Sequence, residues 1–138
     1  MKHVAVGMIM NSGHVLVCQR KRNGSFPLKW EFPGGKLENG EAAEAALVRE
    51  LREELGIDAV VEREFHNQEW NYRDNAVGPA KDATYRVFYF LIRSFTGEPV
   101  NHAFEQIKWV TPKELETMDI LAGNREAVKI LVANVKEE

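Results

Sequence analysis

The chain has 138 residues, of which 44% are hydrophobic and 28% charged, a composition typical of one globular domain. Its formal net charge of -3, from 18 basic and 21 acidic residues, argues against a protein that binds DNA, RNA or an anionic membrane surface. The single cysteine excludes an internal disulfide, and no apolar run reaches the length of a membrane span, about 18 residues. We therefore expect one cytoplasmic domain over residues 1–138, with neither a nucleic-acid polymer nor a membrane as partner.

The N-terminal part of the chain predicts a hairpin followed by loops. Two β-rich runs, 4–10 and 15–20, are separated by Asn-Ser-Gly, which is turn chemistry. The Gly and Pro content of residues 22–27 predicts a loop, and Phe-Pro-Gly-Gly at 32–35 predicts a tight backbone passage.

The remainder of the chain mixes helical and extended patterns, which predicts an α+β domain. Residues 41–55 contain no Gly or Pro and are rich in strong helix formers, so we expect a helix that ends at Gly56. The later elements are a strand over 59–65, a mobile loop over 71–82, a strand over 85–95, a strand over 107–110, a helix beginning at Thr111-Pro112 and an amphipathic helix over 123–135.

The helix predicted over 41–55 carries three glutamates on one flank. Glu50 and Glu54 lie one turn apart and repel each other, and Glu53 lies beside both. This arrangement favours a divalent cation such as Mg²⁺, which prefers oxygen ligands. The alternative is a solvent-exposed acidic face, which an Arg49–Glu53 pair would stabilise. The apolar stripe expected to face the sheet consists of Leu47, Val48, Leu51 and Leu55.

Residues 35–57 read GKLENGEAAEAALVRELREELGI and resemble the Nudix box, the signature of the Nudix hydrolase family. The segment over 20–35 and the region of Asn124 are similar to the MutT-like branch of that family. The resemblance implies an α/β/α sandwich with a mixed sheet between helices. The box positions filled here are Gly35, Glu41, Arg49, Glu50, Glu53, Glu54 and Gly56, with Leu51 and Ile57 in the aliphatic positions.

The resemblance also implies a metal site. It assigns Glu50, Glu53 and Glu54 as ligands of Mg²⁺, with Mn²⁺ as an alternative, and it adds the carbonyl oxygen of Gly34. Glu41 either binds a further ion or places a favourable charge at the N-terminus of the helix.

The family pattern further implies the catalytic roles. Glu50 and Glu53 serve catalysis through the metal, and Arg49 orients the glutamates, because a guanidinium that holds a carboxylate bidentately fixes its geometry. Glu105, which precedes Trp109, is the candidate for an additional carboxylate. Its spacing is shorter than in MutT-like proteins, so the identity of the general base stays open.

Five residues are candidates for substrate binding. Arg20 and Lys36 are expected to contact phosphates, and Glu31 and Phe32 to line the cleft, although Phe32 is equally compatible with the core. Asn124 matches the position of a residue that reads the base, but it also suits a helix N-cap.

Together these features predict Mg²⁺-dependent hydrolysis of a nucleoside triphosphate, with an oxidised purine such as 8-oxo-dGTP as substrate and a nucleoside monophosphate and pyrophosphate as products. The alternatives are a pyrimidine triphosphate such as CTP or dCTP, and another nucleoside diphosphate derivative. A Nudix-like binding module without catalysis is disfavoured, because such modules typically lack box glutamates and all are present here.

Overall fold

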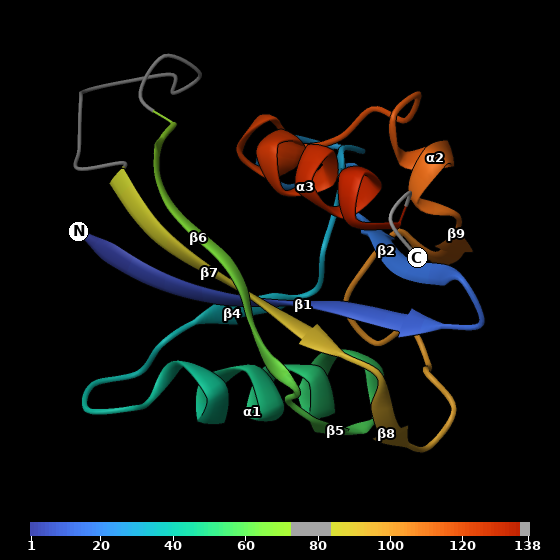
Figure 1. Ribbon diagram of the computed structural model, residues 1–138. Coiled ribbons are helices and arrows are strands. Elements are labelled where there is room, and N and C mark those ends of the chain that lie inside the picture. The colour runs from blue at the N-terminus through green and yellow to red at the C-terminus, as the bar shows by residue number, and fades with distance from the viewer. Residues whose placement is uncertain (73–83, 136–138) are drawn as a thin grey trace.

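The computed structural model describes residues 1–72 and 84–135. A mixed sheet separates α1 on one face from α2 and α3 on the other (Figure 1), and this arrangement confirms the α/β/α sandwich. The helices are α1 (Ala43–Leu55), α2 (Pro112–Leu115) and α3 (Arg125–Val135), the last preceded by a 3₁₀ turn, η2 (Ala122–Asn124). Among the described residues, no helix has the length and apolar character needed to cross a bilayer.

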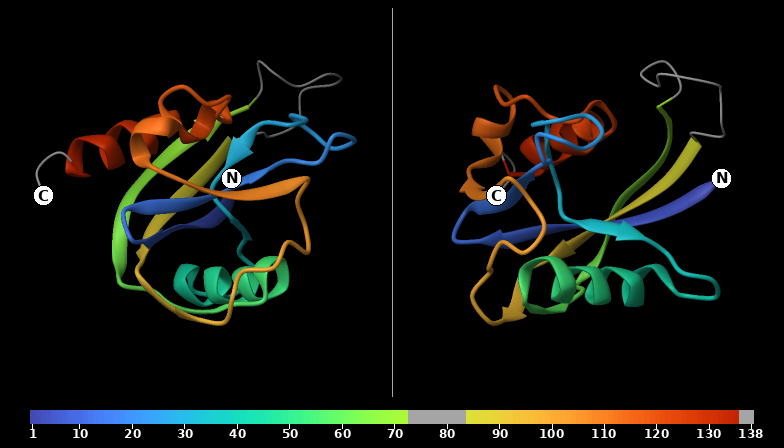
Figure 2. Two further views of the ribbon diagram at one scale, coloured as in Figure 1. Left: turned by 90° about the vertical axis from the view of Figure 1, so that its right-hand side faces the viewer. Right: turned by 180° about the vertical axis from the view of Figure 1, so that it is seen from behind.

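The central strand of the large sheet is β1. It pairs in parallel with β7 and antiparallel with β2 and β4, and the strand order is β3-β2-β1-β7-β6 with β9 on β2. A separate small sheet joins β5 to β8 beside α1 (Figure 2). The strands are β1 (Lys2–Asn11), β2 (His14–Gln19), β3 (Trp30–Glu31), β4 (Gly34–Lys36), β5 (Asp58–Val60), β6 (Arg63–Asn71), β7 (Thr84–Ile92), β8 (Ser94–Thr96) and β9 (Gln106–Val110).

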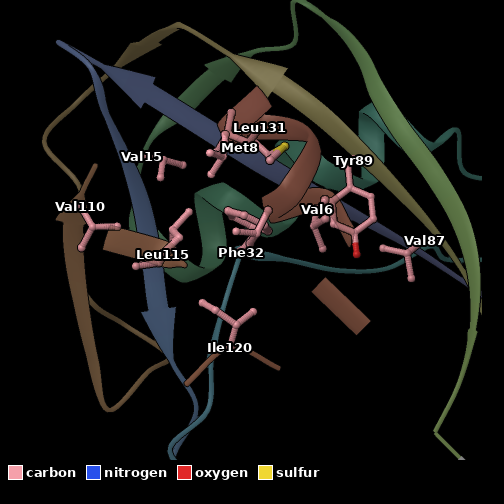
Figure 3. Packing of buried hydrophobic residues seen from close by; sticks show 14 residues of the cluster. Val6, Met8, Val15, Phe32, Val87, Tyr89, Val110, Leu115, Ile120 and Leu131 are labelled. Carbon is pink, nitrogen blue, oxygen red and sulfur yellow. The ribbon is translucent and has the colours of Figure 1, made fainter. Parts of the chain in front are cut away.

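Each face of the sheet supports its own hydrophobic core, because side chains alternate between the two faces of a strand. On β1, Ala5 and Ile9 pack toward α1, whereas Val6 and Met8 join the cluster under α3 (Figure 3). The apolar stripe of α1 is buried as expected except at Val48, which is half-exposed. The buried residues of the helix are Ala46, Leu47, Leu51 and Leu55.

The predicted elements are present, but several of their boundaries differ. Helix α1 begins at Ala43 rather than at 41. The strand expected over 59–65 is interrupted at 61–62 and the strand expected over 85–95 at Arg93, and these breaks create β5 and β8. Most of the loop expected over 71–82 lies outside the described residues, and Asn71 itself ends β6. The short strand β3 ends directly before the tight passage predicted over 32–35, and β4 begins within it at Gly34.

Gly34 marks the closest approach of β4 to β1. Its φ is 151°, and a Cβ there would collide with the carbonyl oxygen of Ala5. We expect Gly34→Ala to lower the free energy of unfolding by more than about 2 kcal/mol, as measured by urea denaturation. Gly40→Ala is the control, because Gly40 also has a positive φ, 76°, but a Cβ would have nothing within 4 Å. An equal decrease in the free energy of unfolding in the two variants would contradict the steric explanation.

Candidate active site

A cavity of about 370 Å³ opens where β1, β4 and β7 meet the segment before α3. A larger cavity, about 720 Å³, is lined by residues such as Met10 and Arg63 and contains no carboxylate in its lining. The smaller cavity therefore carries the candidate chemistry. Seven residues predicted for the site line it, namely Arg20, Glu31, Phe32, Gly34, Lys36, Glu54 and Asn124.

Arg49 organises the carboxylates near the start of α1. Its Nε and Nη2 atoms each donate a 2.9 Å hydrogen bond to Glu41, and its Nη1 donates a 2.9 Å bond to Glu50. The Arg49 guanidinium, together with the backbone N–H of Glu38, lowers the pKa of Glu41 to about 2. Glu41 thus precedes the helix and binds Arg49 bidentately, whereas Arg49 donates a single hydrogen bond to Glu50. The orienting role of Arg49 toward Glu50 stays a prediction.

Glu54 lies on the cavity side of α1. Its Oε1 accepts a hydrogen bond from the backbone N–H of Gly34 at 3.1 Å. Partial burial, followed by repulsion from Glu50, raises the pKa of the Glu54 carboxyl to about 8. A divalent cation beside Glu54 would offset both effects, since it attracts the charged form of the carboxyl.

Glu53 is more exposed than Glu50 and Glu54. Its side chain is 61% exposed, and its Oε1 lies 3.6 Å from Nη1 of Arg49, the atom that also donates to Glu50. Across residues 1–72 and 84–135, no three His, Cys, Asp or Glu side chains lie close enough together to hold a metal ion. In this arrangement Glu54 binds Gly34 whereas Glu50 and Glu53 approach Arg49, so a shared metal site of the three glutamates stays a prediction.

The chemistry of the donor set nevertheless fits a hard divalent cation. Glu50, Glu53 and Glu54 provide only oxygen donors, and burial and the charge of Glu50 raise the pKa of Glu54 despite the hydrogen bond from Gly34. For the three glutamates to bind one cation, the side chain of Glu53 would have to turn, and its exposure leaves room for another rotamer.

The two basic residues of the cavity, Arg20 and Lys36, differ in whether they already have partners within the protein. Arg20 is 2.8 Å from Glu31 and also donates to the carbonyl and hydroxyl oxygens of Ser25. Burial raises the pKa of Glu31, an effect that the charge of Arg20 opposes. Lys36 is exposed at the cavity and has no ion-pair partner among the described residues. Lys36 is therefore more available to a phosphate than Arg20.

Asn124 also lines the cavity and is only 5% exposed. Its Oδ1 accepts a hydrogen bond from the backbone N–H of Phe32, and its Nδ2 donates to the hydroxyl of Tyr89, both at 3.2 Å. Neither bond involves an N–H group of α3, so the capping alternative has no support. Phe32 is 3% exposed and belongs to both the core and the cavity wall.

Aromatic rings line the cavity near Asn124. Tyr72 lies 5.1 Å from Phe26 and 5.6 Å from Tyr85, measured between ring centroids. Phe26 and Tyr85 could not be predicted as part of the site, because one lies in a loop and the other on a distant strand, and no spacing in the sequence links them. These rings offer flat apolar surfaces of the kind on which a nucleobase stacks.

Glu105 lies directly before β9 and is exposed. Its Oε1 accepts a hydrogen bond from the backbone N–H of Arg22 at 3.2 Å, and it does not line the cavity. A catalytic role for Glu105 stays a prediction.

Comparison with known proteins matches residues 1–131 to the NUDIX domain. The 8-oxo-dGTP diphosphatase of Haemophilus influenzae is 32% identical over 130 residues, which cover 94% of this chain and 90% of that protein. The nucleoside triphosphatase NudI of an Enterobacter species is 35% identical over 130 residues, which cover 86% of this chain and 87% of that protein.

Solved structures give the same result. A structure from a study of MutT from Aliivibrio salmonicida and Vibrio cholerae superimposes with a TM-score of 0.79 at 30% identity, covering 96% of this chain and 98% of that chain. The E. coli ORF135 protein superimposes with a TM-score of 0.82 at 27% identity, covering 96% of this chain and 89% of that chain. The fold, the complete box and these relatives together show that the chain belongs to the Nudix family, as a MutT-like hydrolase.

Proposed function

We propose that this protein is a Mg²⁺-dependent nucleoside triphosphate pyrophosphohydrolase that prefers an oxidised purine nucleotide such as 8-oxo-dGTP. The observation that carries the proposal is one cavity whose lining is chemically mixed. Glu54 and Lys36 line it together with Asn124 and the rings of Phe26, Tyr72 and Tyr85. The name of the Haemophilus influenzae relative supports the same substrate class.

The residues around the cavity would have two roles, which are to hold the cation and to stabilise the phosphates. Glu50, Glu53, Glu54 and the carbonyl oxygen of Gly34 would hold the cation, with Arg49 keeping Glu50 in place. When bound, the cation, Mg²⁺ or Mn²⁺, neutralises phosphate charge and lowers the pKa of water. Lys36 would stabilise the negative charge that develops on the phosphates. Arg20 would do the same after giving up one of its contacts with Glu31 or Ser25 for a phosphate oxygen.

Hydrolysis at the middle phosphate would release a nucleoside monophosphate and pyrophosphate. A carboxylate must accept the proton of the attacking water, and the two candidates are Glu53 and Glu105. Glu53 lies on α1 among the residues of the box, 3.6 Å from Arg49, whereas Glu105 would first have to leave the N–H of Arg22.

A substrate panel tests this proposal. Pyrophosphate release is measured for 8-oxo-dGTP, dGTP, CTP and dCTP with Mg²⁺, with Mn²⁺ and with EDTA. We expect turnover only with a divalent cation and the highest kcat/KM for 8-oxo-dGTP. Preference for CTP or dCTP would overturn the substrate assignment, and nucleotide binding without turnover would overturn the enzymatic one.

Replacement of Asn124 tests how the base is read. Guanine presents acceptors at both O6 and N7, whereas its 8-oxo form presents an acceptor at O6 and an N–H at N7. A carboxamide offers both a donor and an acceptor, so we expect Asn124→Ala to lower selectivity for 8-oxo-dGTP over dGTP about tenfold. Steady-state kinetics and thermal unfolding are measured together, because a loss of stability without a loss of selectivity would contradict the role.

A further inference from the structure

The amide of Asn124 is held between two partners with fixed hydrogen-bonding roles. On one side, the backbone N–H of Phe32 can only donate, so it requires the Oδ1 of Asn124. On the other side, the hydroxyl of Tyr89 receives the Nδ2 group at 3.2 Å. The N–H of Phe32 thus sets one end of the amide, and the hydroxyl of Tyr89 reinforces the same orientation only where its oxygen acts as an acceptor.

The hydroxyl of Tyr89 donates its only hydrogen to the carbonyl oxygen of Gly123, at 2.9 Å. The same carbonyl oxygen also accepts a hydrogen bond from Nε2 of Gln68, at 2.6 Å. Toward Asn124 the oxygen of Tyr89 can therefore only accept. Tyr89 is fully buried, and burial raises the pKa of its hydroxyl well above the ordinary value, so the proton remains on the oxygen.

A flipped amide would be penalised at both contacts. It would place Oδ1 against an oxygen with no hydrogen to give, and Nδ2 against the N–H of Phe32. Asn124 is 5% exposed, so water cannot readily compensate for either lost bond. One orientation remains, and it leaves one N–H and one lone pair of Asn124 uncommitted.

We propose that Tyr89 is a positioning residue for base selectivity, because its hydroxyl fixes which way the amide of Asn124 faces. Tyr89 lies on β7 next to Val6 of β1, within the cluster under α3 (Figure 3), and is not itself among the residues that line the cavity. It therefore acts through Asn124 rather than on the nucleotide. This inference rests on the proposed function, in which Asn124 reads the base.

The test is a double-mutant cycle. Selectivity is the kcat/KM for 8-oxo-dGTP divided by that for dGTP, measured below the unfolding temperature of every variant. We expect Tyr89→Phe to lower selectivity about tenfold, and Tyr89→Phe with Asn124→Ala to be no worse than Asn124→Ala alone. Val15→Ala, a fully buried change in the same cluster, should lower stability and leave selectivity unchanged. Unchanged selectivity in Tyr89→Phe, or additive losses in the double variant, would overturn the proposal.

A second measurement needs no substrate. In ¹⁵N NMR, the side-chain amide protons of Asn124 should exchange with solvent slowly in the wild-type protein and at least about tenfold faster in Tyr89→Phe, while Val15→Ala keeps the slow rate. Equal exchange in wild type and Tyr89→Phe would overturn the positioning role, whatever the substrate. Faster exchange in a protein with no preference for 8-oxo-dGTP would instead overturn the proposed substrate and leave the fixed amide orientation supported.

Discussion

Glu53→Gln is expected to lower kcat by about 10³-fold while leaving the free energy of unfolding unchanged. The carboxylate of Glu53 is 61% exposed and makes one long contact with Arg49, so its removal disturbs no packing. Glu53 is both a proposed ligand of the cation and a candidate acceptor of the proton from the attacking water, so the substitution would remove both functions. Pyrophosphate release and urea denaturation, measured on the same preparation, check both halves of the prediction.

Glu44→Gln is the matched control for this variant. Glu44 is an exposed glutamate in the first turn of the same helix, and the substitution changes the net charge by the same amount. We expect its kcat to match that of the wild-type enzyme. A Glu53→Gln protein that keeps its turnover would refute the assignment of Glu53, and an equal loss in both variants would indicate a general effect of charge.

Arg49→Lys is expected to lower kcat/KM by between about 10-fold and 100-fold, because residues that orient metal ligands typically contribute this much. The planar guanidinium donates two bonds to Glu41 and one to Glu50, whereas an ammonium group cannot reproduce this fork. The apparent affinity for Mg²⁺, measured by titrating the rate, should fall as well, since Glu50 would no longer be held in place.

Arg52→Lys separates this effect from the loss of any arginine on α1. The side chain of Arg52 is 65% exposed, and it pairs with Asp58 at 2.7 Å at the far end of the helix. An exposed pair of this kind contributes little to stability, so we expect wild-type kinetics. Similar kinetic losses in Arg49→Lys and Arg52→Lys would contradict the orienting role of Arg49.

Local patterns of the sequence predicted the long elements and the positions of the box residues. The hairpin of β1 and β2 and helix α1 follow from turn chemistry, helix propensity and apolar periodicity, which act within a few residues. The match of the box likewise placed Arg49 and Glu50 on α1, where the structure finds them in contact.

The errors arise where partners distant in sequence decide the structure. β3 and β4 are only 2 and 3 residues long, and pairing with β2 and β1 defines them. A helical wheel gives the direction in which each glutamate leaves the helix, but not whether Gly34, Arg49 or solvent receives its carboxylate. The hydrogen bonds of Tyr89 join β7 to the segment before α3, and no local pattern reports them.

The parallel pairing of β1 with β7 has a consequence for synthesis. Lys2 lies opposite Tyr85, so β1 leaves the ribosome 83 residues before its parallel partner, although β2 and β4 are made soon after it. Until β7 is made, α1 has only part of the surface against which it packs, since Phe90 and Ile92 of β7 belong to the same core cluster as Leu47 and Leu51. A nascent chain that ends before β7 would contain every residue of the box and still lack the scaffold that orders them. Catalytic competence should therefore arise late in translation, in a single step with the closure of the sheet.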